Sequence, residues 1–300
     1  MKILITGANG MLAKAVRERF KDETLILTDV VQDDTIKKLD ITNLEDVTEF
    51  VSNCKPDVII NCAAYTAVDK AEEDLDLARK INADGPKNLA IAAKNADCIL
   101  VHISTDYVFG GNLSLEEIYK EDDEKAPETV YGKTKLEGEE AITANTENYY
   151  IFRTAWLYGD GKNFVRTMLN AGREKEKLNT TLEDAKKECL NVVSDQHGSP
   201  TYAVDLADII AQALEKEIPY GIYHATNLGF TTWYDFTKEI LKMANISCKV
   251  IPVTSEEFVR PAKRPKNSMM SKSKLLDAGV AIPSWEDALE RYLMVELEKN

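Results

Sequence analysis

The 300-residue sequence contains few of the residue types that build metal centres and disulfide frameworks. It has five cysteines and three histidines, all dispersed, without a Cys-x-x-Cys pair or a His/Asp/Glu cluster at metal-ligand spacing. These absences exclude a disulfide scaffold and predict no metal site. They are typical of a reduced, cytoplasmic protein.

Long apolar runs and an excess of positive charge are also missing. No apolar run approaches the ~18 residues of a membrane span, and the N-terminus begins with a strand pattern rather than a signal peptide. The formal net charge of −14 argues against a nucleic-acid surface, because phosphate binding needs clustered Lys and Arg. The sequence also lacks a P-loop and a Gly-x-Ser-x-Gly elbow. We therefore expect neither a membrane nor a nucleic-acid partner.

The first half of the chain alternates continuous apolar segments with helical patterns. Continuous apolar, β-branched segments are typical of strands covered on both faces, as in a parallel sheet. The predicted strands are Lys2–Thr6, Leu25–Thr28, Asp57–Asn61, Ile99–Ser104 and Tyr149–Arg153, and the predicted helices are Met11–Phe20, Leu44–Asn53, Leu75–Lys94 and Tyr131–Ala144. Thr42-Asn43-Leu44-Glu45 is a capping-box pattern ahead of the second helix. The alternation predicts an α/β fold with a doubly wound parallel sheet of the Rossmann type.

The second half is less regular and predicts a smaller C-terminal lobe. Short strand patterns at Asn191–Val193, Gly221–His224 and Lys249–Val253 alternate with helical patterns at Val204–Leu214, Trp233–Met243 and Trp285–Glu296. We predict a Rossmann domain over residues 1–155 and a mainly substrate-binding lobe over residues 156–300, interleaved with the last strands of the sheet. The highly charged stretch Glu174–Glu188 is interpreted as a solvated helix or loop.

A glycine-rich turn follows the first strand and predicts a dinucleotide site. Gly7 allows a tight turn, Gly10 allows the backbone to approach a pyrophosphate, and Ala13 is small enough for helix and strand to pack closely. The helix N-terminus would supply N–H groups and a positive dipole end for the phosphates. We therefore predict NADH or NADPH as cofactor.

Asp29, at the end of the second strand, predicts how the adenosine ribose is bound. A carboxylate there accepts hydrogen bonds from the 2′-hydroxyl and repels a 2′-phosphate. Because no Arg or Lys follows until Lys37, NADH is favoured over NADPH. Asp29 could alternatively be a turn aspartate. Asp40 and Ile41 could flank the adenine, or Asp40 could simply precede a helix cap.

Tyr131 and Lys135 lie four residues apart at the start of a predicted helix, and hence on one helix face. A tyrosine that moves a proton at neutral pH needs a pKa below ~10, and a nearby lysine charge favours the phenolate. The Tyr-x-x-x-Lys pattern also occurs at Tyr158/Lys162 and Tyr234/Lys238. Only Tyr131/Lys135 follows a strand that ends in hydroxyl residues, so this pair is the predicted catalytic pair.

The strand before that helix ends in Ser104-Thr105, where ligands bind in doubly wound folds. The Thr105 hydroxyl could polarise a substrate carbonyl beside Tyr131, and Ser104 competes for this role. Both hydroxyls could instead cap the strand end. His102 lies within the apolar run and is interpreted as a core histidine rather than a ligand.

Several longer motifs carry a resemblance to a known family. They are NCAAYTAVDKAE (Asn61–Glu72), STDYVF (Ser104–Phe109), YGKTKLEGE (Tyr131–Glu139), RTAWLYG (Arg153–Gly159), DQHGSPT (Asp195–Thr201) and RPKNS (Arg264–Ser268). On these motifs the chain resembles the dTDP-4-dehydrorhamnose reductases, within the extended short-chain dehydrogenase/reductase superfamily. The resemblance covers nearly the whole chain.

The resemblance implies an activity and the residues that carry it. The family reduces the C4 ketone of dTDP-4-dehydro-6-deoxy-L-mannose with NADH or NADPH and so forms dTDP-L-rhamnose. Tyr131 would then be the proton donor, Lys135 its partner and ribose anchor, and Thr105 the residue that binds the reacting oxygen. The substrate would also contact Asp106, Trp156 and Arg264. The cofactor would be lined by Gly7, Gly10, Met11, Leu12, Asp29, Asp40, Ile41, Ala63, Ala64, Tyr65 and Thr66.

Two departures and two alternatives accompany this resemblance. Ala13 replaces the commoner third glycine. Some members dimerise around a magnesium ion held partly by an acid in the first helix; Ala13–Val16 contains no acid, so we do not expect that dimer, and both a monomer and a homodimer stay open. The alternative functions are a nucleotide-sugar epimerase that recycles a retained NAD, and a non-catalytic regulatory subunit like the β subunit of methionine adenosyltransferase.

Overall fold

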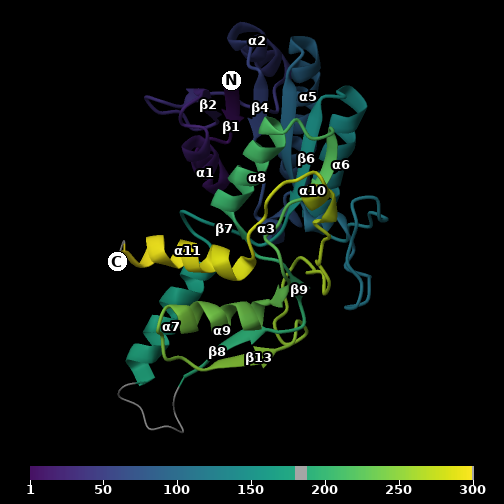
Figure 1. The fold of residues 1–300 in the computed structure, drawn as a ribbon. Helices are drawn as coiled ribbons and strands as arrows, with labels where there is room; N and C mark the ends of the chain where they lie inside the picture. The colour runs from purple at the N-terminus through teal and green to yellow at the C-terminus, as the bar shows by residue number, and fades with distance from the viewer. Residues whose placement is uncertain (180–187, 299–300) are drawn as a thin grey trace.

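The computed structural model describes residues 1–179 and 188–298. In this part of the chain a seven-stranded sheet, parallel at every pairing, forms the centre of the larger lobe (Figure 1). In spatial order the strands are β11 (Gly221–His224), β6 (Tyr149–Thr154), β5 (Ile99–Thr105), β4 (Val58–Asn61), β1 (Lys2–Thr6), β2 (Thr24–Asp29) and β3 (Lys37–Lys38). The chain runs outward from β1 in both directions, so the doubly wound prediction is confirmed.

Helices cover both faces of this sheet. One face carries α1 (Met11–Arg19) and α8 (Ala203–Glu215), and the other carries α2 (Leu44–Cys54), α5 (Gly85–Ala96) and α6 (Val130–Asn145). Side chains of β1 alternate between the two cores, because Ile3 and Ile5 pack with α1 and α8 while Leu4 packs with α2 and α5. Burial on both faces explains why the strands read as continuous apolar runs.

The predicted helix Leu75–Lys94 is broken into three parts. Here α4 (Leu75–Arg79) is followed by a π-helical turn, η1 (Lys80–Asp84), and then by α5. Within the turn Asn82 is fully buried and accepts a hydrogen bond from the Tyr65 backbone N–H at 2.8 Å, while its amide donates to the Tyr65 carbonyl at 3.1 Å. The wide turn therefore fixes the loop after β4 to the helical layer.

The capping-box prediction ahead of α2 is wrong by one residue. Asn43, not Thr42, is the N-cap, and its side-chain oxygen accepts from the backbone N–H groups of Glu45 and Asp46. Thr42 is engaged elsewhere, because its hydroxyl donates to Asp40 at 2.9 Å. Asparagine is at least as good an N-cap as threonine, so the local sequence offered two competing caps.

A second core lies beside the sheet lobe, at the bottom of Figure 1. It is built by α7 (Phe164–Asn179), α9 (Trp233–Met243), α11 (Trp285–Glu298) and the parallel pair β8 (Leu190–Val193) and β13 (Val250–Val253). The remaining short elements are α3 (Val68–Ala71), η2 (Asp106–Val108), β7 (Leu157–Tyr158), β9 (His197–Gly198), β10 (Thr201–Tyr202), β12 (Thr231–Thr232) and α10 (Ser273–Asp277).

The chain passes between the two cores more than once. After α7 and β8 in the second core, α8 and β11 return to the sheet, and α9 then rejoins the second core. The domain boundaries at residues 155 and 156 stay a prediction. Of the charged stretch 174–188, residues 174–179 belong to α7, whereas residues 180–187 lie outside the described residues. Within the described ranges no helix has the length and apolar character needed to cross a membrane.

Candidate functional site

The glycine-rich turn between β1 and α1 is shaped for close backbone approach. Gly7 has φ +66°, and a Cβ there would lie 2.6 Å from the Ala63 backbone nitrogen. Only glycine fits this position, both in conformation and in space. Gly10 then begins α1 without a side-chain cap, and Ala13 is fully buried against the sheet. The start of α1 therefore presents backbone N–H groups, which suits a pyrophosphate.

A cavity of about 460 Å³ extends from this turn to the start of α6. It brings together most of the predicted site residues: Gly10, Met11, Leu12, Ala63, Ala64, Thr66, Thr105, Asp106, Tyr131, Lys135 and Trp156. These residues come from the carboxyl ends of β1, β4, β5 and β6 and from α6. Backbone glycines, small residues and one Tyr/Lys pair along one cavity fit a dinucleotide that ends beside the Tyr131 hydroxyl.

The other predicted cofactor residues lie outside this cavity. Asp29 accepts hydrogen bonds from the backbone N–H groups of Asn9 at 3.1 Å and Val31 at 3.2 Å, so its carboxylate holds the glycine-rich turn. Asp40 accepts from the Thr42 backbone N–H and hydroxyl, as a residue preceding a helix cap would. Ile41 is 5 % exposed and packs in the core beneath the sheet. Gly7 and Tyr65 do not line the cavity either, and the Tyr65 backbone is hydrogen-bonded to the Asn82 side chain.

The start of α6 places Tyr131 and Lys135 at the end of β5. The hydroxyl of Thr129 caps the helix by accepting from the Gly132 N–H at 3.0 Å. A Cβ on Gly132 would lie 2.2 Å from the carbonyl oxygen of Tyr107, so the missing side chain lets α6 begin directly against η2. The Tyr107 ring contacts the Tyr131 ring edge-on, with centroids 5.5 Å apart. These contacts fix where the Tyr131 ring lies.

The predicted lowering of the Tyr131 pKa by Lys135 is not found. Burial raises the pKa of the Tyr131 hydroxyl to about 12, against the opposing effect of a hydrogen bond with Thr105. Lys135 is 1 % exposed, and burial lowers its pKa to about 8. Its amine contacts the Ile103 carbonyl at 2.5 Å and His102 Nε2 at 3.1 Å. Both groups of the pair are therefore shifted toward their neutral forms.

The two competing hydroxyls at the end of β5 have different environments. Ser104 donates to the Glu139 carboxylate at 2.5 Å, and the same carboxylate forms a buried two-point ion pair with Arg153. Thr105 donates to Asp106 at 2.9 Å and caps η2 by accepting from the Tyr107 N–H. Ser104 is thus part of a buried charge network, whereas Thr105 is the hydroxyl that contacts both Tyr131 and Asp106.

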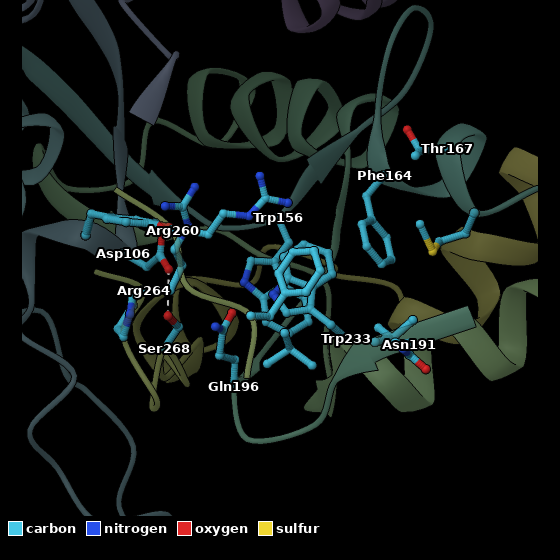
Figure 2. Close-up of a pocket in the computed structure, with 16 residues that line it drawn as sticks. Asp106, Trp156, Phe164, Thr167, Asn191, Gln196, Trp233, Arg260, Arg264 and Ser268 are labelled. Atoms are coloured by element: carbon cyan, nitrogen blue, oxygen red, sulfur yellow. Dashed lines mark hydrogen bonds between the residues drawn. The ribbon is translucent and has the colours of Figure 1, made fainter. Parts of the chain in front are cut away.

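A second cavity of about 450 Å³ adjoins the first, since Asp106, Tyr107 and Trp156 line both. Figure 2 shows Asp106, Ser268, Arg260 and Arg264 on one side of the tryptophan pair and Asn191 on the other. The indole rings of Trp156 and Trp233 stack with centroids 3.7 Å apart. Trp156 has φ +49°, a backbone conformation that side chains rarely adopt. The residues that line this cavity come from both the sheet lobe and the second core.

Arg264 is held at the edge of this cavity by an ion pair. Its guanidinium donates to both carboxylate oxygens of Asp69 in α3, one of them at 2.9 Å, and Asp69 also accepts from the Ala262 N–H at 3.1 Å. Arg260 lines the same cavity, with its guanidinium 4.8 Å from the Phe258 ring centroid. The basic loop of residues 260–266 thus places two guanidinium groups along the same side of the second cavity.

Several lining residues were not predicted from the sequence. The first cavity also contains Asn61, Cys62, Val68, Ile103, Tyr107, Thr154, Ala155, Leu157 and Lys162, and the second contains Trp233, Phe164, Asn191, Gln196, Arg260 and Ser268 among others. Lys162 belongs to the second Tyr-x-x-x-Lys pair, whose Tyr158 is instead buried in the second core. Trp233 begins α9, in a segment with no chemical motif of its own.

Comparisons with known proteins relate this chain to one family. Residues 1–297 match the family model described as RmlD substrate binding domain. A crystal structure of a dTDP-4-dehydrorhamnose reductase from Clostridium acetobutylicum is 48 % identical, covers 100 % of both chains and superposes with a TM-score of 0.89. Another, from Bacillus anthracis in complex with NADP, is 40 % identical over 98 % of this chain and 99 % of that one, with a TM-score of 0.88.

A curated relative gives the same result from sequence alone. The dTDP-4-dehydrorhamnose reductase of Mycolicibacterium smegmatis is 38 % identical over 295 residues, which are 96 % of this chain and 84 % of the relative. The resemblance predicted from the motifs is therefore confirmed, over nearly the whole chain. This chain belongs to the dTDP-4-dehydrorhamnose reductase family, whose family model describes the RmlD substrate binding domain.

Proposed function

We propose that this protein reduces the C4 ketone of dTDP-4-dehydrorhamnose with NADH or NADPH to give dTDP-L-rhamnose. The observation that carries this proposal is that Thr105, Tyr131 and Lys135 line the first cavity together with Asp106, Tyr107 and Trp156, the three residues that also line the second cavity. One cavity begins at the glycine-rich turn and suits a dinucleotide; the other is lined by aromatic and basic side chains and suits a nucleotide sugar. A ketone between them lies within reach of the Tyr131 hydroxyl.

The residues at this junction have distinct roles. When bound, the nicotinamide cofactor supplies the hydride for the carbonyl carbon. Tyr131 keeps its proton at neutral pH because burial raises its pKa to about 12, so it is suited to act as an acid toward the developing alkoxide. The Thr105 hydroxyl donates its single proton to Asp106 at 2.9 Å in this structure, and it would steady the same oxygen by turning that proton toward the substrate.

The second cavity supplies the groups that a dTDP-sugar requires. We propose that Trp156 contacts the sugar and that Arg264 and Arg260 pair with the diphosphate, because guanidinium groups bind phosphate oxygens at two points. Arg264 is already oriented by Asp69. Asp106, 4 % exposed and bound to Ser268 at 2.7 Å, is placed to accept a sugar hydroxyl.

We propose that NADH is favoured over NADPH, although the sheet adds a feature that the sequence did not reveal. Asp29 lies at the end of β2 as predicted, yet β3 pairs beside it with Lys38 in register opposite Asp29. A lysine there would offset part of the repulsion between Asp29 and a 2′-phosphate. We therefore expect the protein to use both cofactors, and we expect the Asp29 carboxylate to make NADH the preferred one.

The deciding experiment follows the absorbance of NADH and of NADPH with enzymatically generated dTDP-4-keto-6-deoxy-L-hexulose. Oxidation that depends on the sugar supports the reductase. Cofactor binding without oxidation would contradict it and would favour an epimerase or a regulatory subunit. An epimerase would interconvert sugars with retained NAD and no added reductant, and a regulatory subunit would change the activity of a separate catalytic partner.

A further inference from the structure

Lys162 lies in the short loop between β7 and α7, where the chain passes from the sheet lobe into the second core. Within the described ranges, Lys135 and Lys162 are the two basic residues that line the first cavity. The second cavity is lined instead by Arg260 and Arg264. The sequence showed Lys162 only as part of a second Tyr-x-x-x-Lys pair, and the proposed reaction leaves this lysine without a role.

The loop that carries Lys162 lies against the start of α1. A Cβ on Gly159 would lie 3.2 Å from the Met11 Cγ, so the absence of a side chain lets the loop approach the first residue of that helix. Lys14, in the first turn of α1, forms an ion pair with Asp160 at 3.0 Å. Met11 also lines the first cavity. The loop therefore brings Lys162 to the part of the cavity where we expect the pyrophosphate of a dinucleotide.

Asn163 fixes the shape of this loop. It is 8 % exposed, and its side-chain amide donates to the carbonyl of Gly159 at 2.6 Å and to that of Gly161 at 3.1 Å. Its side-chain oxygen accepts from the Arg166 N–H at 3.0 Å, at the start of α7. Gly161 has φ +109°, which favours glycine. The backbone on either side of Lys162 is thus held in place, whereas the Lys162 side chain is exposed.

The charge of Lys162 is not neutralised by a neighbouring acid. Asp160 is the acid nearest to it in the sequence, and its carboxylate is paired with Lys14 at 3.0 Å and with Arg166 at 3.8 Å. In the part of the chain that the structure describes, the Lys162 amine forms neither an ion pair nor a hydrogen bond. Its positive charge is therefore available to an anion bound in the first cavity.

The glycine-rich turn needs a further donor to hold a pyrophosphate. Three N–H groups of the turn, those of Ala8, Asn9 and Gly10, already donate within the protein. The acceptor for Asn9 is the Asp29 carboxylate, which adds negative charge beside the turn. The N–H groups from Met11 onward remain for the phosphates, and a helix N-terminus supplies only about half of an elementary positive charge. A lysine at this place would offset the remaining negative charge of two phosphoryl groups.

We propose that Lys162 binds the pyrophosphate of the nicotinamide dinucleotide, with its amine donating to phosphate oxygens opposite the start of α1. The inference rests on the proposed function, because it concerns the cofactor of that reaction. The dinucleotide is then held by backbone N–H groups of the sheet lobe and by a lysine on the segment that leads into the second core. Lys162 contributes to cofactor affinity, whereas proton transfer takes place beside Tyr131.

Fluorescence titration with NADH tests this role without turnover. We expect Lys162→Met to raise the Kd for NADH by about fivefold, as for a well-placed ion pair at an exposed site. The Kd of this variant should also depend less steeply on NaCl concentration than that of the wild type, because a screened ion pair is lost. Lys162→Arg keeps the charge and should bind NADH nearly as tightly as the wild type.

Lys133→Met is the matched control for the loss of one positive charge. Lys133 is an exposed lysine of α6 that lines neither cavity, so its replacement should leave the Kd for NADH nearly unchanged. If Lys162→Met and Lys133→Met bind NADH with the same Kd and the same salt dependence, the proposal is overturned.

Titration with dTDP shows which phosphates Lys162 contacts. Because Lys162 lines the first cavity and not the second, Lys162→Met should bind dTDP as the wild type does. A Kd that rises for dTDP and not for NADH would overturn the proposal. The proposed function fails separately: wild-type protein that binds NADH but does not oxidise it with the sugar nucleotide contradicts the reductase, while weaker NADH binding by Lys162→Met still supports the role of the lysine.

Discussion

Arg264 and Asp69 form a two-point ion pair between segments 195 residues apart in the sequence. Asp69 lies in α3, which follows the loop after β4, and Arg264 lies in the basic loop near the C-terminal end of the chain. The pair therefore joins the sheet lobe to the loop that lines the second cavity. The guanidinium beside it holds the pKa of the Asp69 carboxyl below its usual range.

Replacing Arg264 should weaken substrate binding more than turnover. Arg264→Met removes a proposed diphosphate partner, and we expect KM for the sugar nucleotide to rise by about tenfold or more, equivalent to ~1.4 kcal/mol. Arg264→Lys keeps the charge but loses the two-point geometry, so its KM should lie between those of Arg264→Met and the wild type. Steady-state kinetics at saturating cofactor measure this. An unchanged KM in Arg264→Met would remove Arg264 from the substrate site.

Removing the Tyr131 hydroxyl should abolish most of the turnover. We expect Tyr131→Phe to lower kcat by roughly 10²–10⁴, because the proton donor is lost while the ring and its packing remain. Cofactor binding, followed by fluorescence titration, should survive. Tyr234→Phe is the matched control, since Tyr234 and Lys238 repeat the same spacing in α9 outside both cavities. Near-normal turnover in Tyr131→Phe would refute the assignment.

Asn82 should matter for cofactor affinity although it does not line the cofactor cavity. Asn82→Ala leaves the Tyr65 N–H and carbonyl without their side-chain partner, at a cost of about 1–3 kcal/mol for buried polar groups. The loop from Ala63 to Thr66 should loosen, and cofactor affinity should fall more than thermal stability alone explains. Asn88→Ala is the control, because Asn88 is a buried asparagine of α5 that donates to the Ile41 carbonyl instead. Equal cofactor affinities in the two variants would contradict this account.

Local sequence patterns predicted most strands of the sheet and the candidate catalytic residues, whose roles stay a prediction. Five predicted strands match observed strands to within one residue at each end, since burial on both faces makes them continuously apolar. Gly7 and Thr105 come directly at the ends of such strands, whereas the Tyr131/Lys135 pair is marked by its spacing at the start of α6. The short strand at Lys37–Lys38 escaped prediction because two exposed lysines carry no apolar pattern.

Other parts of the site depend on contacts that the sequence does not order. Ser104 and Thr105 are adjacent hydroxyls, and only the fold shows that the first donates to Glu139, which is itself paired with Arg153. The π-helical turn at Asn82 lies inside a continuous helical pattern. Trp233 reaches the second cavity from a distant helix by stacking on Trp156. Each is a long-range packing relationship, which periodicity and spacing leave unspecified.

Asp106 should make the protein less stable at neutral pH than an uncharged residue would. Burial raises its pKa from 3.8 to about 6, against the opposing hydrogen bonds of Ser268 and Thr105. Because the folded-state pKa is higher than the unfolded one, stability is lost as pH rises from ~4 to ~6, by about 3 kcal/mol at most. Asp106→Asn should therefore be more stable than wild type above pH 6, and the difference should close toward pH 4.

Urea unfolding across this pH range measures the effect of Asp106. Asp205→Asn provides the contrasting control: Asp205 is also buried, but it is paired with Arg291 at 2.8 Å, so its replacement should destabilise the protein at neutral pH. Kinetics of Asp106→Asn should show a lower kcat/KM, since Asp106 orients Thr105. A constant stability difference between pH 4 and 7 would show that Asp106 does not titrate as stated.

Cofactor preference should change when the charge at the end of β2 changes. Asp29→Asn keeps one oxygen to accept from Asn9 or Val31 but removes the repulsion of a 2′-phosphate, so kcat/KM for NADPH should rise relative to NADH by about tenfold. Lys38→Ala should act in the opposite direction, because Lys38 is in register opposite Asp29 on β3. Lys37→Ala, one residue away on the same strand, is the control and should leave the ratio nearly unchanged. If Asp29→Asn and wild type use the two cofactors in the same ratio, Asp29 serves the glycine-rich turn alone, and the 2′ position of the ribose is recognised elsewhere.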